Sequence, residues 1–338
     1  MPAISMFIMG LTLYYSMVIA AKFNVFDYSK WSIKVYGRTG AIMAPAYEIL
    51  FNGVLVLATA VAFATGGSTL EKAIGTPYLL NTVVIAGVIF VLTIYGSALV
   101  RKAATVISLI LIACIFIIYL PNIIYFFPKI LHNFAALKSG AFDTGVHSSF
   151  VDTLWWGVKY GALQCCAVGA YIVHTKVCPD KSCLKKAAIL GFLINTGIMY
   201  LTYFGIMAFL DEGVLKEAVP SLFVVMNGVG GTWMTVLITV CIVVGAVSTG
   251  VALVYGTTNR LTNFFGRNLD EAKRAEKRGF HSIIASIILV VICWLVAQLG
   301  LIPLIGKGYG SLGWVSMLVV TVPVVLRGLG LWKFSTEK

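Results

Sequence analysis

Three polar side chains lie close together inside one apolar stretch of the sequence. Tyr160 and Gln164 are four residues apart, so on a helix they share one face, where a bound small molecule would meet a phenol and an amide. Lys159 lies about 12 Å from the nearer end of the stretch, at about 1.5 Å per helical residue. If this stretch crosses a membrane, a charge at that depth is costly and is a candidate for function.

Several roles fit the charge of Lys159. The ammonium group can pair with a substrate carboxylate, or it can replace a bound cation and couple movement of the substrate to protons. It can pair with Glu48, the other charge inside an apolar stretch, which lies about 10 Å deep from the opposite side. It can also extend to the nearer membrane surface. The sequence leaves these roles open.

Glycines and hydroxyls give two further patterns. Gly157 and Gly161 flank Tyr160, where glycine permits a helix break and a close backbone approach to a ligand. The alternative is that these small residues only allow close helix packing. In a later stretch, Ser248 and Thr249 with the carbonyl of Gly245 offer hard oxygen ligands for Na⁺. The alternative is that both hydroxyls bond back to carbonyls of their own helix.

Standard catalytic motifs are absent from the sequence. There is no H-E-x-x-H, no G-x-S-x-G and no phosphate-binding P-loop, so we expect no enzyme and no cofactor. His174, Cys178 and Cys183 are spaced too loosely for a typical four-ligand zinc site, so we expect no metal centre.

The elements that must position these residues are membrane helices. Of the 338 residues, 59% are hydrophobic and only 11% are charged. This composition excludes a soluble enzyme, a disordered chain and a disulfide scaffold, and it indicates an all-α polytopic membrane protein. Nine apolar runs are long enough to cross a bilayer: 3–21, 41–65, 78–99, 104–127, 151–174, 187–210, 233–255, 281–301 and 312–329. A short outer helix is predicted over Pro220–Asn227, ended by the glycine-rich segment 228–231.

The Lys and Arg residues alternate between the two sides of these runs. Nineteen of the 25 fall in the loops after the first, third, fifth and seventh runs or at the C-terminal end. This distribution predicts an N-terminus outside and a C-terminus in the cytoplasm. It also explains the net charge of +12 by contact with an anionic inner leaflet, so no nucleic-acid partner is expected.

Five short segments then carry a resemblance that extends over almost the whole chain. They are Asp27-Tyr28 with Tyr36-Gly37, LWWGVKYGALQ at 154–164, AVP at 218–220, GAVSTGVA at 245–252 with Tyr255-Gly256, and GYGSLGW at 308–314. In order and spacing the chain resembles the YkvI-type bacterial membrane proteins, a branch of the amino acid–polyamine–organocation superfamily. The resemblance implies a LeuT-type fold of two inverted five-helix repeats in a multi-pass protein of the bacterial cell membrane.

The resemblance also implies an arrangement and a function. The nine runs correspond to family helices two to ten, with first-repeat helices over 3–127, an outer loop over 128–150, second-repeat helices over 151–330 and a cytoplasmic tail over 331–338, all in one transmembrane domain. The family's first helix, which forms half of the substrate site, has no counterpart. The implied function is transport of an amino acid or similar small amine by alternating access, coupled to Na⁺ or H⁺. Substrate contacts then fall on Gly157, Lys159, Tyr160, Gly161 and Gln164, and ion ligands on Gly245, Ser248 and Thr249. The alternatives are a non-transporting membrane interaction subunit and a truncated, inactive remnant.

Overall fold

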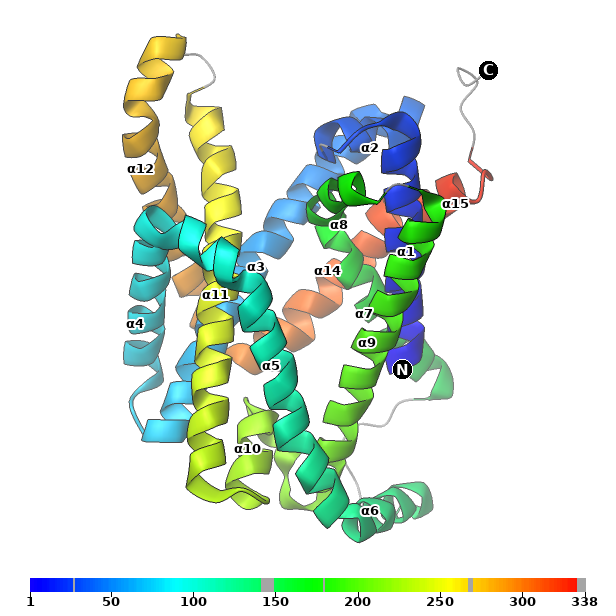
Figure 1. The fold of residues 1–338 in the computed structure, drawn as a ribbon, viewed down its shortest axis with the longest axis vertical. Helices are drawn as coiled ribbons and strands as arrows, with labels where there is room; N and C mark the ends of the chain where they lie inside the picture. The colour runs from blue at the N-terminus through cyan, green and yellow to red at the C-terminus, as the bar shows by residue number, and fades with distance from the viewer. Residues whose placement is uncertain (27, 141–148, 179, 267–269, 333–338) are drawn as a thin grey trace. The chain divides into compact units, whose positions relative to one another are not determined.

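The structure, a computed structural model, is helical throughout its described residues. It describes residues 1–26, 28–140, 149–178, 180–266 and 270–332, and no strand occurs among them (Figure 1). Eight helices in this part of the chain are long and apolar enough to cross a membrane: Pro2–Phe23, Gly40–Ile74, Tyr78–Gly96, Lys102–Tyr125, Lys181–Met207, Gly231–Thr262, Glu276–Ala297 and Leu301–Gly328. The chain is therefore built as a polytopic helical membrane protein, as its composition predicts.

The predicted run at 151–174 is an interrupted helix. It consists of α7 (Phe150–Gln164), the 3₁₀ turn η3 (Cys165–Ala167), α8 (Val168–Tyr171) and the 3₁₀ turn η4 (Ile172–Val177). The 15 residues of α7 span only about 22 Å at about 1.5 Å per residue, less than a bilayer core of about 30 Å. For this reason the described chain has eight continuous candidates for crossing where nine apolar runs are predicted.

The chain divides into two compact units, each assembled from separate segments. Unit 1 comprises Met1–Val54, His147–Tyr200 and Gly306–Lys338, and unit 2 comprises Leu55–Val146 and Leu201–Ile305. Unit 1 holds α1 (Pro2–Phe23), α2 (Tyr28–Tyr36), η1 (Gly37–Thr39), the first part of α3 (Gly40–Ile74), α7 to η4, most of α9 (Lys181–Met207), α14 (Gly310–Ser316), the π-helical turn η8 (Met317–Thr321) and α15 (Val322–Gly328). Both units draw on the first and the second predicted repeat.

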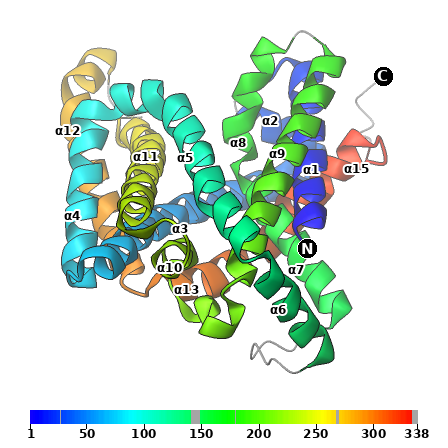
Figure 2. The same cartoon turned by 60° about the horizontal axis from the view of Figure 1, so that its bottom comes forward.

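Unit 1 is organised around α7. This helix packs against α1 on one side and α14 on another, and α1 also packs against α15. Figures 1 and 2 show α1 running beside α9. The amphipathic α2 lies across this group: Trp31 donates from its indole nitrogen to the carbonyl of Ser16 at 3.1 Å, and Tyr36 donates to the carbonyl of Val319 at 2.6 Å. Both aromatic side chains are fully buried, so they fix α2 to α1 and η8.

Unit 2 is a bundle centred on one long helix. It holds the rest of α3, α4 (Tyr78–Val91), the π-helical turn η2 (Leu92–Gly96), α5 (Ser97–Tyr125), α6 (Phe127–Ser139), η5 (Leu210–Glu212), η6 (Val214–Lys216), α10 (Pro220–Asn227), α11 (Gly231–Phe265), α12 (Glu271–Ala297) and α13 (Leu301–Pro303). The π-helical turn η7 (Leu304–Tyr309) runs from this unit into unit 1. α11 contacts α4, α5, α10 and α12, and Figure 2 shows α4, α11 and α12 side by side.

The short helix predicted over Pro220–Asn227 is confirmed with the same bounds as α10. Two side chains of α5 hold it in place. Tyr119 shares a hydrogen bond of 2.6 Å with the hydroxyl of Ser221, and the side-chain carbonyl of Asn122 accepts from the backbone N–H of Val229 at 2.9 Å. A Cβ at Gly228 would overlap the Asn122 side chain, so the break after α10 requires glycine there.

The predicted loop over 128–150 contains a helix, α6, while residues 141–148 lie outside the described residues. Asn133 donates to the carbonyl of Met207 at 2.9 Å, and Lys129 pairs with Asp211 at 3.2 Å and also with Glu212. Partial burial by itself would lower the pKa of Lys129, but the hydrogen bonds to Glu212 and Asp211 outweigh burial, so the pKa is raised above its ordinary 10.5.

The raised pKa of Lys129 predicts a loss of stability in alkaline solution. Because the folded-state pKa lies above the unfolded one, the contribution is fully present below about pH 10.5 and is lost as pH rises through the folded value. We expect Lys129 to contribute less than about 1 kcal/mol to the free energy of unfolding, because its ion pairs are partly solvated. Above this pH, the unfolding temperature of wild type should fall more steeply with rising pH than that of Lys129→Met. Lys138→Met on the same helix serves as the control and should follow wild type.

Candidate functional site

A cavity of about 410 Å³ lies in unit 1 beside the interrupted helix. Tyr160 and Gln164 of α7 both line it, together with residues of α1, α8 and α9. The prediction that these two side chains share one face is therefore confirmed. A second phenol and a second amide come from Tyr171 and Asn195. Four flexible, apolar methionine side chains also line the cavity: Met6, Met9, Met17 and Met199. The volume suits a small molecule with a few polar groups.

The interruption of α7 is stabilised by Tyr47 from the first part of α3. Its hydroxyl donates to the carbonyl of Cys166 at 3.3 Å and accepts from the backbone N–H of Gly169 at 3.1 Å. The hydroxyl thereby bridges the two sides of the break, where backbone groups have lost their regular helical partners. Ser316 of α14 donates to the carbonyl of Ala162 on the preceding turn. These two residues fix the backbone beside the cavity.

The two glycines that flank Tyr160 serve helix packing. A Cβ at Gly161 would overlap the carbonyl oxygen of Ser5 and lie 3.0 Å from Ile8, so α1 approaches α7 at this point. At Gly157 a Cβ would lie 3.4 Å from the carbonyl oxygen of Met1. Of the two alternatives for these glycines, close packing thus has direct geometric support. Their contact with a substrate stays a prediction.

Lys159 lies on another face of α7 from Gln164, since five residues turn a helix by about 140°. Its side chain is buried, with Nζ 3.4 Å from the ring centroid of Trp156. Trp156 lies about one turn nearer the N-terminal end of α7, so the ammonium group points toward that end but remains buried, and extension to the membrane surface stays a prediction. Glu48 lies on α3 next to Tyr47 and is half-buried. A pairing of Lys159 with Glu48 or with a substrate stays a prediction.

The candidate ion ligands belong to unit 2. Gly245 lies inside the uninterrupted helix α11, and its role as an ion ligand stays a prediction. Thr235, Thr239 and Thr257 of this helix donate back to carbonyls four residues earlier. Among the described residues, no such bond is found for the hydroxyls of Ser248 and Thr249, and their role as ion ligands stays a prediction.

Cys178 and Cys183 lie close together before and at the start of α9. The sulfur atoms of Cys178 and Cys183 lie 2.7 Å apart, and the side chain of His174 lies outside the described residues. Within the described part of the chain, no group of three or more His, Cys, Asp or Glu side chains is arranged to hold a metal ion.

No family model and no curated protein matches this sequence. The fold and the cavity beside α7 are therefore the basis on which a function can be proposed.

Sequence reasoning did not identify Tyr47, Ser316, Tyr171 or Asn195. One feature of the sequence could have drawn attention to Tyr47: it directly precedes Glu48, one of the two charges within the apolar runs. A tyrosine in an apolar run is most often a packing or interfacial residue, however, and only the tertiary structure brings its hydroxyl to the helix break.

Proposed function

We propose that the chain is a secondary transporter that binds an amino acid or a similar small amine in the cavity beside α7. The observation that carries the proposal is the interrupted helix, next to a mainly apolar cavity with two phenols and two amides in its lining, in a protein of long apolar helices. In membrane transporters, discontinuous helices supply the polar contacts to small substrates near the middle of the bilayer.

Each group at the cavity has a role in this proposal. The Gln164 amide donates to a substrate carboxylate or accepts from an amine, and the Tyr160 hydroxyl does the same from the next turn. The methionines accommodate an apolar substrate side chain. Alternating access moves unit 1 as one body, because α1, α7 and α14 pack together within it. Coupling is to Na⁺ or H⁺, with Ser248 and Thr249 as the ion ligands.

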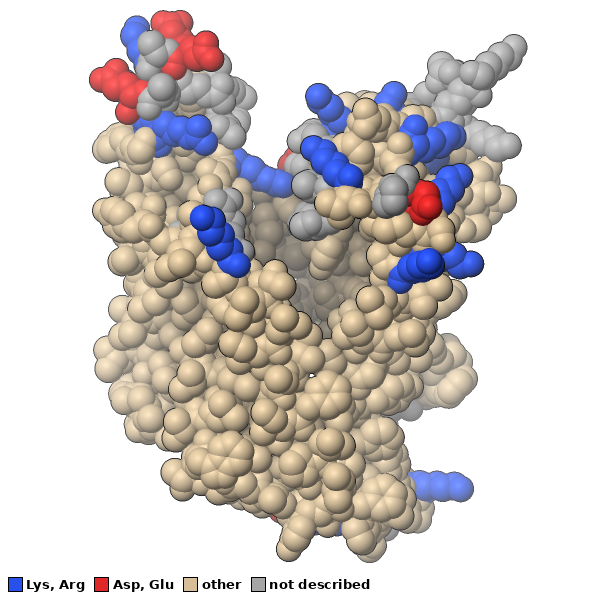
Figure 3. All heavy atoms as spheres, in the orientation of Figure 1, with Lys and Arg blue, Asp and Glu red and all other residues tan. Residues whose placement is uncertain are grey.

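The same proposal includes a LeuT-type inverted-repeat fold in the bacterial inner membrane. The interrupted helix α7 to η4 provides the ninth crossing, with the N-terminus outside and the C-terminus in the cytoplasm. The distribution of charge supports this orientation. Lys and Arg side chains gather at the end of unit 1 where α1 ends and α9 begins (Figure 3), and this would be the cytoplasmic end.

Uptake into proteoliposomes tests the transport proposal. With an equimolar mixture of radiolabelled common amino acids outside, wild type is expected to accumulate at least one of them along an imposed Na⁺ or H⁺ gradient. Gln164→Leu should reduce the apparent affinity about ten- to a hundredfold, the effect of losing a hydrogen bond to a charged group. The control is Asn227→Leu on the exposed surface of α10. Equal uptake by wild type, Gln164→Leu and Asn227→Leu would contradict the site.

Two substitutions test whether the charge of Lys159 or its contact with the Trp156 ring is what matters for uptake. If the ammonium group recognises substrate charge, Lys159→Ala should abolish uptake at normal membrane expression. Trp156→Leu removes the cation–π contact, worth about 0.5–2 kcal/mol, but keeps the charge, so it should keep uptake. Retained uptake in Lys159→Ala, or the same phenotype in both variants, would show that the lysine only anchors the helix.

The alternative function is a membrane interaction subunit without transport. One observation favours it: only 6% of the most apolar window of α9 is buried, so this helix offers a broad apolar face. An inactive remnant is the third reading. Gradient-driven uptake by the purified chain alone would exclude both.

A further inference from the structure

A second cavity in unit 1 lies between α1 and α9, and its lining includes a lysine, which the cavity beside α7 lacks. Its volume is about 620 Å³. Gly10, Ala188 and Phe192 line this cavity as well as the one beside α7, so the two are neighbours. The remaining lining residues are Phe7, Leu11, Tyr14, Tyr15, Lys185, Ile189 and Leu193.

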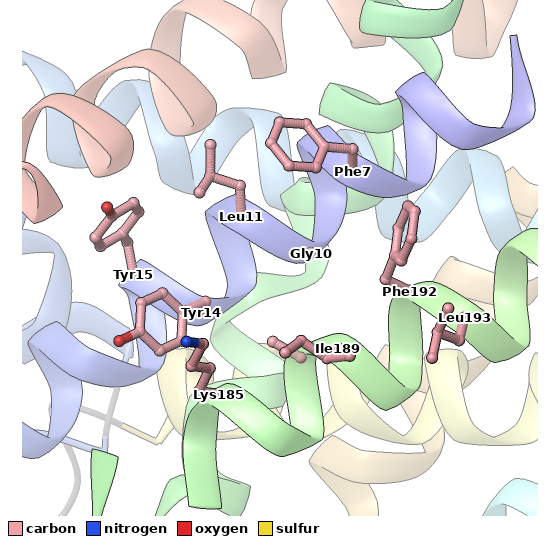
Figure 4. Close-up of a pocket in the computed structure, with 10 residues that line it drawn as sticks. Phe7, Gly10, Leu11, Tyr14, Tyr15, Lys185, Ile189, Phe192 and Leu193 are labelled. Carbon is pink, nitrogen blue, oxygen red and sulfur yellow. The ribbon is translucent and has the colours of Figure 1, made fainter. Parts of the chain in front are cut away.

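The polar residues of this cavity lie at one end, and its large apolar residues lie at the other. Figure 4 shows Lys185, Tyr14 and Tyr15 together at one end, with Phe7, Phe192 and Leu193 at the other. Lys185 is exposed and belongs to the first turns of α9. From Lys185 to Leu193 the helix rises about 12 Å, at about 1.5 Å per residue. The cavity is thus a groove with a cationic, phenolic end and an apolar end, and Phe7 and Leu193 at the apolar end are exposed.

From this arrangement we propose that the groove is a binding site for an anionic phospholipid. The phosphate lies at Lys185 and within reach of the phenolic hydroxyls, and one acyl chain runs between α1 and α9 along Leu11 and Ile189. The charge of Lys185 complements the headgroup, because basic pockets between membrane helices bind anionic lipids. Tyrosine at the same level is the residue type favoured at the headgroup boundary. The proposal does not depend on transport activity.

A lipid fits the groove better than another membrane helix. Closely packed membrane helices meet through small residues along their contact. Here Gly10 and Ala188 are the small lining residues, and the rest of the wall consists of larger side chains, with Phe7, Phe192 and Leu193 at the end opposite Lys185. A flexible acyl chain can follow such a wall.

Native mass spectrometry of the full chain in detergent tests the proposal. Phosphatidylglycerol and phosphatidylcholine with identical acyl chains are titrated against wild type, Lys185→Ala and Lys186→Ala. Wild type should prefer phosphatidylglycerol about fivefold, the effect of one lysine near a headgroup. Lys185→Ala should lose this preference, whereas Lys186→Ala, on the next exposed residue outside the groove, should keep it.

A filling variant tests the acyl part separately. Ile189→Trp places a large side chain in the groove and should weaken binding of both lipids, while Leu190→Trp, exposed on the same helix outside the groove, should not. Equal binding of the two lipids to wild type, or equal effects of Lys185→Ala and Lys186→Ala, would overturn the proposal. It would also be overturned by a dimer that Ile189→Trp dissociates, because a helix of a second copy would then occupy the groove.

Discussion

Gly161→Ala is expected to lower the free energy of unfolding by about 1–3 kcal/mol, the range for overpacking a tight contact. The added methyl group would overlap the carbonyl oxygen of Ser5, which belongs to the backbone of α1 and cannot rotate away. Either α1 must move from α7 or the helix must bend, and both changes disturb the wall that carries Tyr160. The loss should appear as a lower unfolding temperature in detergent.

The chain offers a matched control for this substitution. Gly197 also lies within a long helix, α9, but a Cβ there would meet nothing within 4 Å. Gly197→Ala should therefore leave stability unchanged, or raise it by up to about 1 kcal/mol through better helix propensity. If Gly161→Ala and Gly197→Ala had the same effect, the close approach of α1 to α7 would be contradicted.

Tyr47→Phe is expected to destabilise the helix break by about 2 kcal/mol or more. The substitution keeps the ring but removes the hydroxyl that donates to Cys166 and accepts from Gly169. Both backbone groups then lose a partner in a buried setting, at about 1–3 kcal/mol for each unsatisfied group. In a membrane interior water replaces such partners poorly.

Hydrogen exchange gives the direct measurement for this prediction. The amide of Gly169 should exchange faster in Tyr47→Phe than in wild type, while amides in the middle of α1 should be unaffected. Tyr95→Phe is the control, since the Tyr95 side chain is 83% exposed. Unchanged protection at Gly169 in Tyr47→Phe would show that the hydroxyl does not hold the break.

Local and periodic features of the fold were accessible from the sequence. Long apolar runs predicted the membrane helices, and Pro220 with the following glycines predicted both ends of α10. The four-residue spacing of Tyr160 and Gln164 placed them on one face, and the structure opens that face to a cavity. These features depend on neighbours along one helix, which the sequence contains.

Features that depend on distant parts of the chain were not accessible. Gly161 could serve a ligand or a helix, and only the position of Ser5 on α1 distinguishes them. The break after Gln164 is held by Tyr47, more than a hundred residues earlier in the chain.

The central claim is that a small molecule binds in the cavity beside α7, and a thermal-shift screen tests it most directly. Wild type, Gln164→Leu and Asn227→Leu, purified in detergent, are heated with common amino acids and amines, with and without Na⁺. One chemical class should stabilise wild type and Asn227→Leu, by about 2.7 kcal/mol at a hundred times its dissociation constant, and should stabilise Gln164→Leu much less. If no compound stabilises folded, monodisperse wild type, or if Gln164→Leu responds as wild type does, the cavity is not the binding site.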